Sequence, residues 1–280
     1  MTDEYQKIRQ KLVEFYGKQE FEKALEVAKE LRDNFPEHYV AAYFNLALVQ
    51  ANLNQVEDTL TTLEEAYEKG AWWSGEQLNY FPNIESIKSN PKFPDLLKKF
   101  QQRFEEEKKQ AKLKWIVREP KDYDGTKPFP ILIALHWGFS NIEAFEPFWK
   151  DIVNMGFLLA LPQSSQLCGL NSYTWMDLDL GLQELEQTRS EIKEKYNFDS
   201  TNVYLAGTSI GGKLALEASF IRPKFPVKGV IAVIPYDIKP NELIANKKQV
   251  LEQGIKCCIV TGTEDPSYEP CKKFVNLMEK

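Results

Sequence analysis

From Leu113 onwards the chain alternates between two hydrophobic patterns, and this alternation restricts its fold more than any other feature. Short apolar runs rich in Ile, Leu and Val are bounded by Pro, Gly, Asn or Asp, which is typical of buried strands. Longer stretches of helical periodicity separate them. Such alternation favours an α/β fold with a doubly wound, mostly parallel sheet and right-handed crossovers. The strands are expected at residues 113–117, 130–136, 156–162, 202–208, 228–235 and 255–262.

The fourth of these strands runs into a motif that carries chemistry. In NVYLAGTSIGGKLALEASF, Gly207, Ser209 and Gly211 stand in GxSxG register between a predicted strand and a predicted helix. A strained turn there would lift the Ser209 hydroxyl above the sheet, and the glycines would let the two backbones pass closely. The motif predicts Ser209 as a nucleophile; the alternative is a serine that only caps the helix.

The motif and its surroundings resemble the α/β-hydrolase superfamily. ILIALHWGFSN ends a strand in His136, Trp137 and Gly138, where many lipases and esterases carry an oxyanion loop, and LPQSSQ, YTWMDLD and YNFDSTNVYLAGTSIGG follow the layout of the carboxylesterase, phospholipase and dienelactone-hydrolase branch. This resemblance, which spans residues 113–280, implies a cofactor-independent hydrolase of small carboxylic esters. It implies oxyanion donors in the amide of Ile210 and in that of Trp137 or Gly138. Trp137 departs from the family, which prefers glycine directly after this histidine.

The resemblance also implies a catalytic acid, and IKCCIVTGTEDP places Asp265 in the position that the family uses. The alternative for Asp265 is a turn residue that caps the next helix. Asp237 is a weaker candidate for the acid, with a structural turn as its alternative. Trp175 and Asp177 are candidates for the pocket wall, and simple packing explains Trp175 equally well.

The histidine that a serine hydrolase of this type needs after the acid is missing. The chain holds two histidines, His38 in the helical half and His136, which by resemblance orients the oxyanion loop. Three interpretations stay open: a serine esterase that keeps its nucleophile but lacks its base, a hydrolase fold that binds a ligand without turning it over, and a helical-repeat adaptor with the hydrolase domain as scaffold. We favour the first and expect impaired hydrolysis.

Residues 1–112 differ from the rest, because their apolar positions recur at helical spacing. Positions in residues 8–31 recur 35 residues later: Ile8, Leu12, Phe21, Ala24, Ala28 and Leu31 correspond to Tyr43, Ala47, Val56, Thr59, Leu63 and Ala66. YGKQEFEKALEVAKELRDNFPEH resembles the tetratricopeptide family, which implies paired helices and a possible protein partner. Two repeats are few, so Trp72, Trp73, Tyr80 and Phe81 are expected to close the stack, with a peptide-binding groove as the alternative. A domain boundary is expected near Lys112.

Charge and composition narrow the classes of partner. The net charge of −6 and pI of about 5.3 disfavour nucleic acid and anionic membrane surfaces. The N-terminus lacks the apolar segment of a signal peptide, so a cytoplasmic protein is expected. The four cysteines, which show no CxxC pair, are expected to be reduced and buried. With two histidines in the chain, a histidine-based metal site is not expected.

Overall fold

The computed structural model describes residues 3–279 and divides into two compact units. The helical unit comprises the described residues up to Gln110 together with Cys168–Leu170. The sheet unit comprises Ala111–Leu167 and the described residues from Asn171 onwards. The chain therefore enters the helical unit a second time, for three residues, which the change of periodicity near Lys112 did not predict. No helix within residues 3–279 is long and apolar enough to cross a membrane.

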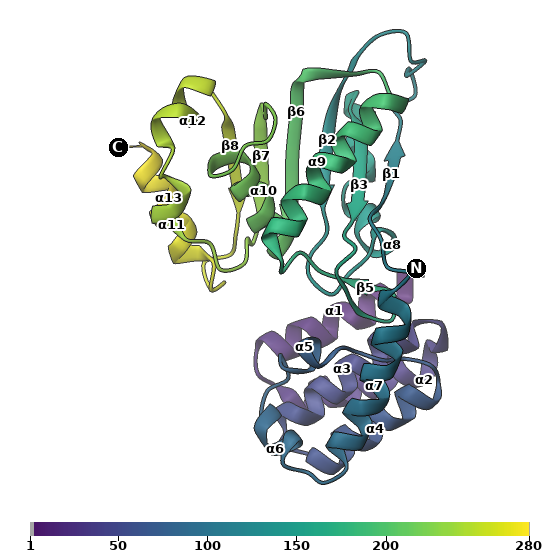
Figure 1. Cartoon of the computed structure of the whole chain (residues 1–280). Helices are drawn as coiled ribbons and strands as arrows, with labels where there is room; N and C mark the ends of the chain where they lie inside the picture. Colours follow the sequence, from purple (N-terminus) through teal and green to yellow (C-terminus); the bar gives the residue numbers. More distant parts are fainter. Residues whose placement is uncertain (1–2, 280) are drawn as a thin grey trace. The chain divides into compact units, whose positions relative to one another are not determined.

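Four long helices form the first part of the helical unit, and consecutive helices pack against one another (Figure 1). Small buried residues such as Ala24, Ala28 and Ala47 let the helix backbones approach closely. Pro36 begins a short 3₁₀ turn that ends the second helix and leads into the third. The helices are α1 (Asp3–Gly17), α2 (Phe21–Asn34), α3 (Tyr39–Asn52), α4 (Val56–Glu68), α5 (Gly75–Leu78), α6 (Ile84–Lys88) and α7 (Phe93–Lys108).

An aromatic cluster occupies the interior of this unit. Trp72 and Trp73 are fully buried, and the Trp73 ring lies 5.5 Å from Phe44 and 5.8 Å from Phe100. Backbone hydrogen bonds tie the cluster to the returning segment: Ser74 N donates to Cys168 O (2.8 Å), and Leu170 N donates to Trp72 O (3.0 Å).

The four aromatic residues expected to close the stack do not all do so. Trp72, Trp73 and Phe81 are buried, as expected. Tyr80 is 45% exposed, because it lies in the turn that follows α5. The expectation for Tyr80 is therefore wrong.

The sheet unit contains a six-stranded sheet with every strand that the apolar runs predict (Figure 1). Its order is β1-β3-β2-β6-β7-β8; β1 is antiparallel to β3, and the other neighbours are parallel. The strands are β1 (Lys114–Arg118), β2 (Phe129–Leu135), β3 (Leu158–Gln163), β6 (Phe198–Thr208), β7 (Gly229–Val233) and β8 (Lys256–Val260). Two further short strands are β4 (Leu167–Gly169) and β5 (Ser172–Tyr173).

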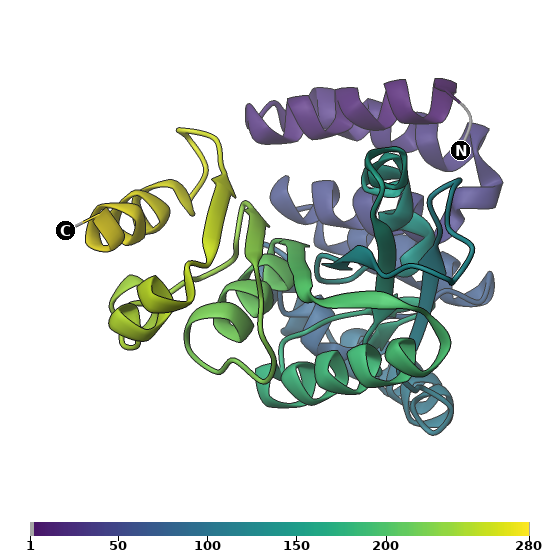
Figure 2. The ribbon, with the colours of Figure 1, turned by 90° about the horizontal axis from the view of Figure 1, so that it is seen from above.

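Strand β2 shows how the sheet buries both faces. Ile131, Ile133 and Leu135 belong to one hydrophobic cluster, whereas Leu132 and Ala134 belong to another, as the alternation of side chains along a strand requires. The first cluster includes residues of α9 (Leu178–Lys195), α10 (Ile210–Phe220) and α13 (Tyr268–Glu279), and α9 and α10 can be followed beside the sheet in Figure 2. The second includes residues of α8 (Ile142–Phe145) and of the 3₁₀ turn at Lys150–Met155.

Strand β8 lies at the edge of the sheet and is mostly exposed. Cys257 and Cys258, which point to opposite faces of this strand, are both exposed, whereas Cys168 and Cys271 are buried. The expectation that all four cysteines are buried is therefore wrong for the pair on β8, because an edge strand has a neighbour on one side only. The remaining short helices of this unit are α11 (Pro240–Leu243) and α12 (Lys247–Gln253).

Candidate active site around Ser209

Ser209 lies between β6 and α10 in a backbone conformation that is neither helical nor extended. Its φ of 55° and ψ of −121° place it in a region that residues with a side chain rarely adopt. Two hydrogen bonds hold it there: Ser209 N donates to Val233 O (2.9 Å), and Tyr236 N donates to Ser209 O (3.0 Å). The strained turn that the GxSxG motif predicts is therefore present, and the segment after β7 holds it in place.

The glycines of the motif lie where no side chain fits. A Cβ on Gly207 would stand 2.3 Å from the carbonyl oxygen of Gly211, and one on Gly211 would stand 2.4 Å from the carbonyl oxygen of His136. Both neighbours are backbone atoms, which cannot rotate away as a side chain can. The start of α10 thus packs directly on the end of β6 and on the loop that follows β2.

This β2 loop contains Gly138, which lies next to Ile210, the residue that follows the candidate nucleophile. A Cβ on Gly138 would stand 3.3 Å from Cγ2 of Ile210 and 3.5 Å from the hydroxyl oxygen of Thr174. Within residues 3–279 no group accepts a hydrogen bond from the amides of Gly138 or Ile210. Two unbonded amides in adjoining backbone segments, one of them at the positive N-terminal end of a helix, can stabilise negative charge.

The side chain of His136 holds the β2 loop through a hydrogen bond to the backbone of Trp137. Its ring is fully buried against Trp175, and burial lowers the pKa of His136 to about 4, so the ring is neutral at pH 7. Nδ1 lies 2.8 Å from Trp137 O and must carry the proton, because a carbonyl oxygen can only accept. Since the peptide is planar and trans, the N–H of Gly138 then points away from the His136 ring.

Trp137, the residue that departs from the family pattern, has its side chain among other aromatic rings. Its ring centroid lies 5.4 Å from that of Phe145 and 5.5 Å from that of Phe148, both in edge contacts. The peptide between Trp137 and Gly138 is held separately, by His136. A bulky residue at this position is therefore compatible with a Gly138 amide that points away from the His136 ring.

Hydrogen bonds clamp the far end of the β2 loop. Ser140 and Tyr173 exchange two backbone hydrogen bonds of 3.1 and 2.8 Å, and the Asn141 side chain donates to Asn171 O (2.8 Å). Phe139, between Gly138 and this clamp, has a φ of 62°. The loop is thus fixed at both ends around Gly138.

The candidate acid Asp265 lies in the turn after β8. Its Oδ1 accepts hydrogen bonds from the amide (2.8 Å) and the hydroxyl (2.6 Å) of Ser267. This arrangement matches the alternative of a structural turn, while a catalytic role for Asp265 remains a hypothesis. The pocket-wall candidates have structural roles, since Trp175 is fully buried in the core and Asp177 caps α9 by accepting from Leu180 N (3.0 Å).

Asp237, the weaker candidate for the acid, follows β7 and is bound by two lysines. Its Oδ1 accepts from Lys239 (2.5 Å), and its Oδ2 lies 3.5 Å from Nζ of Lys213. The hydrogen bond from Lys239 and the charge of Lys213 lower the pKa of Asp237. Lys213 is a residue that the sequence reasoning missed; a lysine one helical turn after the motif serine was the available signal.

The two histidines belong to different units, and the contacts of each are with residues other than Ser209. His136 is the one histidine of the sheet unit and is engaged with Trp137. His38 belongs to the helical unit, where its ring stacks on Tyr5 at 3.8 Å. Among the described residues no group of three His, Cys, Asp or Glu side chains could hold a metal ion.

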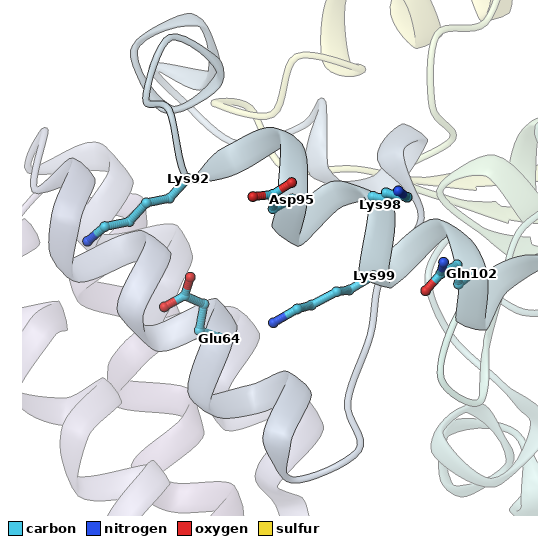
Figure 3. Close-up of a pocket in the computed structure, with 6 residues that line it drawn as sticks. All are labelled: Glu64, Lys92, Asp95, Lys98, Lys99 and Gln102. Atoms are coloured by element: carbon cyan, nitrogen blue, oxygen red, sulfur yellow. The ribbon is translucent and has the colours of Figure 1, made fainter.

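The helical unit has hollows of its own. One of about 420 Å³ lies between α4 and α7 and is lined by charged and polar side chains of both signs: Glu64, Lys92, Asp95, Lys98, Lys99 and Gln102 (Figure 3). Lys92 is paired with Glu57 (2.9 Å), and Lys99 lies over the Tyr67 ring. The charged residues that line this hollow have both signs and are partnered locally. They are typical of a solvated surface and do not indicate a site for one class of ligand.

No known family model and no curated protein sequence matches this chain. Its structure is similar to that of an uncharacterized protein from Bacillus cereus ATCC 10987, with 24% identity over 100% of this chain and 88% of that chain and a TM-score of 0.51. It also resembles an S-formylglutathione hydrolase (FrmB) from Staphylococcus aureus (11% identity, 59% of this chain, 79% of that chain, TM-score 0.44) and esterase PE8 (13%, 60%, 99%, TM-score 0.41). The first of these similarities shows a shared fold along the whole chain.

Proposed function

We propose that this protein is a serine hydrolase that acts on carboxylic esters through Ser209, with Asp265 as its acid. One observation carries the proposal. The strained turn at Ser209 presents a serine at the N-terminus of α10, directly beside the unbonded amides of Ile210 and Gly138. Such strain costs about 1–3 kcal/mol and persists at sites where presenting a group is useful.

The geometry supports acyl transfer. The Ser209 oxygen would attack the ester carbonyl carbon, and the electron pair of the C=O bond would move to the carbonyl oxygen. The amides of Ile210 and Gly138 would stabilise this oxyanion. Collapse would then expel the alcohol and leave an acyl group on Ser209, which water would hydrolyse.

The proposal includes an impaired base, because the sequence has no histidine after Asp265, where a serine hydrolase of this type carries it. The proton would pass to solvent, and the attack would be slow. In serine proteases the loss of a triad member leaves a residual advantage of roughly 10³ to 10⁴ over water. We therefore expect weak hydrolysis by this chain, confined to esters with good leaving groups.

Labelling with a fluorophosphonate tests the proposal directly. The phosphonate should attach to Ser209, as peptide mass spectrometry would show, and Ser209→Ala should abolish the label. Ser219 is a control residue, because its hydroxyl is fully buried and donates to Ala215 O (2.7 Å). Absence of label on Ser209 in the folded protein would refute a hydrolase and favour a fold that only binds.

A second candidate function is the binding of a protein partner by the helical unit, whose first repeat resembles the tetratricopeptide family. The supporting observation is a mostly apolar hollow of about 280 Å³ on α1 and α3, lined by Arg9, Leu12, Val13, Tyr16, Gly17, Asn45, Leu48 and Val49. Val13 is 61% exposed there. An apolar hollow beside an exposed aliphatic side chain could receive an apolar side chain of a partner protein.

Pull-downs with the full chain would test this second function. A partner captured by the natural chain should be lost with Val13→Glu, and retained with Leu251→Glu, which changes an exposed residue of the sheet unit. Equal capture by the two variants would contradict binding through the α1 and α3 hollow.

A further inference from the structure

Lys213 lies one helical turn after the candidate nucleophile, on the same helix. Its amide donates to Ser209 O (3.0 Å), so the two residues share the first turn of α10. Its side chain is only 14% exposed, which is uncommon for lysine, and Nζ lies 3.5 Å from Oδ2 of Asp237. This lysine is therefore directed at the turn after β7 and not at solvent.

The turn after β7 has a backbone that needs support. Ile234 and Asp237 have φ values of 39° and 42°, so two residues with side chains adopt left-handed conformations within four positions. Each such residue costs free energy unless its surroundings hold it in place. Asp237 is held from two sides, by Lys213 and by Lys239.

The same turn provides the hydrogen bonds that hold Ser209. Val233 O accepts from Ser209 N, and Tyr236 N, next to Asp237, donates to Ser209 O. Gly212 brings the helix against this turn as well, since a Cβ there would stand 3.4 Å from Cα of Pro235. Anything that loosens Asp237 therefore loosens a hydrogen-bond partner of Ser209.

We propose that Lys213 is a positioning residue for the nucleophile: its ion pair with Asp237 fixes the turn after β7, and this turn holds the strained backbone of Ser209. Lys213 acts through Asp237 and Tyr236 and makes no contact with the reacting atoms. The expected effect on rate rests on the proposed hydrolase function. The effect on the backbone at Tyr236 does not, which gives the proposal an independent readout.

The test compares Lys213→Met, Lys213→Arg, Asp237→Asn and the Lys213→Met/Asp237→Asn double variant in the full chain. Two quantities are measured: the second-order rate of fluorophosphonate labelling at Ser209, and the hydrogen-exchange rate of the Tyr236 amide. Lys213→Met and Asp237→Asn should each slow labelling about fivefold to tenfold and speed exchange at Tyr236. The double variant should be labelled no more slowly than either single variant. Lys213→Arg should be labelled at nearly the natural rate, because arginine keeps the ion pair.

Arg118→Met is the matched control, because Arg118 pairs with Glu146 (2.5 Å) in the same unit, on the edge strand β1. It should leave both quantities unchanged. Labelling and Tyr236 exchange at wild-type rates in Lys213→Met would overturn the proposal, as would losses that multiply in the double variant. An equal loss in Lys213→Arg would overturn it too, since that result assigns Lys213 a chemical role that a guanidinium cannot fill. If the natural chain takes no label, the hydrolase proposal fails, and exchange at Tyr236 alone decides whether Lys213 positions this backbone.

Discussion

The carbonyl oxygen of His136 lies 2.4 Å from the point where a Cβ on Gly211 would stand. The loop that carries the proposed oxyanion amide and the helix that carries the proposed nucleophile are thus in direct backbone contact. Gly211 contacts the loop on one side and Gly207, at the end of β6, on the other. Neither the loop nor the helix can therefore move without disturbing the other. The proposed site depends on this contact.

Gly211→Ala should therefore destabilise the protein strongly. The added methyl group meets backbone atoms, so the cost should exceed the usual 1–3 kcal/mol of overpacking, and labelling of Ser209 should disappear. Denaturant unfolding would measure the change. Gly262→Ala is the control, because an added Cβ there meets nothing within 4 Å, and it should alter stability by less than about 0.5 kcal/mol. Equal stability of the two variants would contradict the close contact.

Ser209→Gly should stabilise the protein while removing its proposed chemistry. Glycine adopts a φ of 55° with a ψ of −121° far more easily than serine, so relief of strain should raise the free energy of unfolding by about 1 kcal/mol. Ser209→Ala should change stability little, because alanine also has a Cβ and so keeps the backbone strain. Thermal and denaturant unfolding would separate the two variants, and a Ser209→Gly protein less stable than Ser209→Ala would argue against strain at this position.

Stability should depend on the titration of His136. Its pKa is about 4 in the folded protein and about 6.5 when unfolded, so between these values the unfolded chain binds more protons. The stabilisation is therefore fully present above pH 6.5 and falls as the pH drops to 4, by about 3 kcal/mol in all. His136→Asn, which retains a side-chain N–H donor, should show a shallower decline over this interval than the natural chain. Identical pH profiles would contradict a neutral buried His136.

Hydrolysis of a p-nitrophenyl ester by this chain should be slow, and added imidazole should accelerate it. An external base can accept the Ser209 proton in place of the histidine that, as proposed above, this serine lacks. The imidazole-dependent gain must vanish in Ser209→Ala, which corrects for the direct reaction of imidazole with the ester. Efficient hydrolysis without imidazole that His136→Ala or His38→Ala abolishes in a folded protein would instead establish an unusual triad.

Limited trypsin digestion should cut first between Gln101 and Pro128. This stretch contains the exposed end of α7 and the lysines at 108, 109 and 112, and exposed polar connections open locally at low cost. N-terminal sequencing of the fragments would locate the cut. Resistance throughout this interval, with cleavage elsewhere, would argue for one fused core.

Much of the sheet unit could be predicted from the sequence, because buried strands require apolar runs and the nucleophile turn requires small residues at fixed spacing. Ser209, Gly207 and Gly211 are found through their local sequence alone. Lys213 and Asp237 are 24 positions apart and meet only because β7 lies next to β6 in the sheet. No local pattern announces such a pair.

Exposure was harder to anticipate than secondary structure. The apolar run CCIV in β8 predicts a buried strand, yet its two cysteines are exposed. The order of the strands, and not their composition, determines which strand lies at the edge of the sheet. The role of Asp265 could not be predicted either. A turn-capping aspartate and a catalytic aspartate are both expected in the turn after a strand. Distinguishing them requires the position of a base, which short-range patterns do not contain.

The return of Cys168–Leu170 to the helical unit has a consequence for the autonomy of the two parts. A protein fragment that ends near Lys112 would contain the helices. It would lack the partners that Ser74 N and Trp72 O have in the whole chain. A single recombination event near Lys112 would separate the helices from the three residues that bond to Ser74 and Trp72. A chimaera would keep both hydrogen bonds only if it also carried those three residues from the middle of the other part.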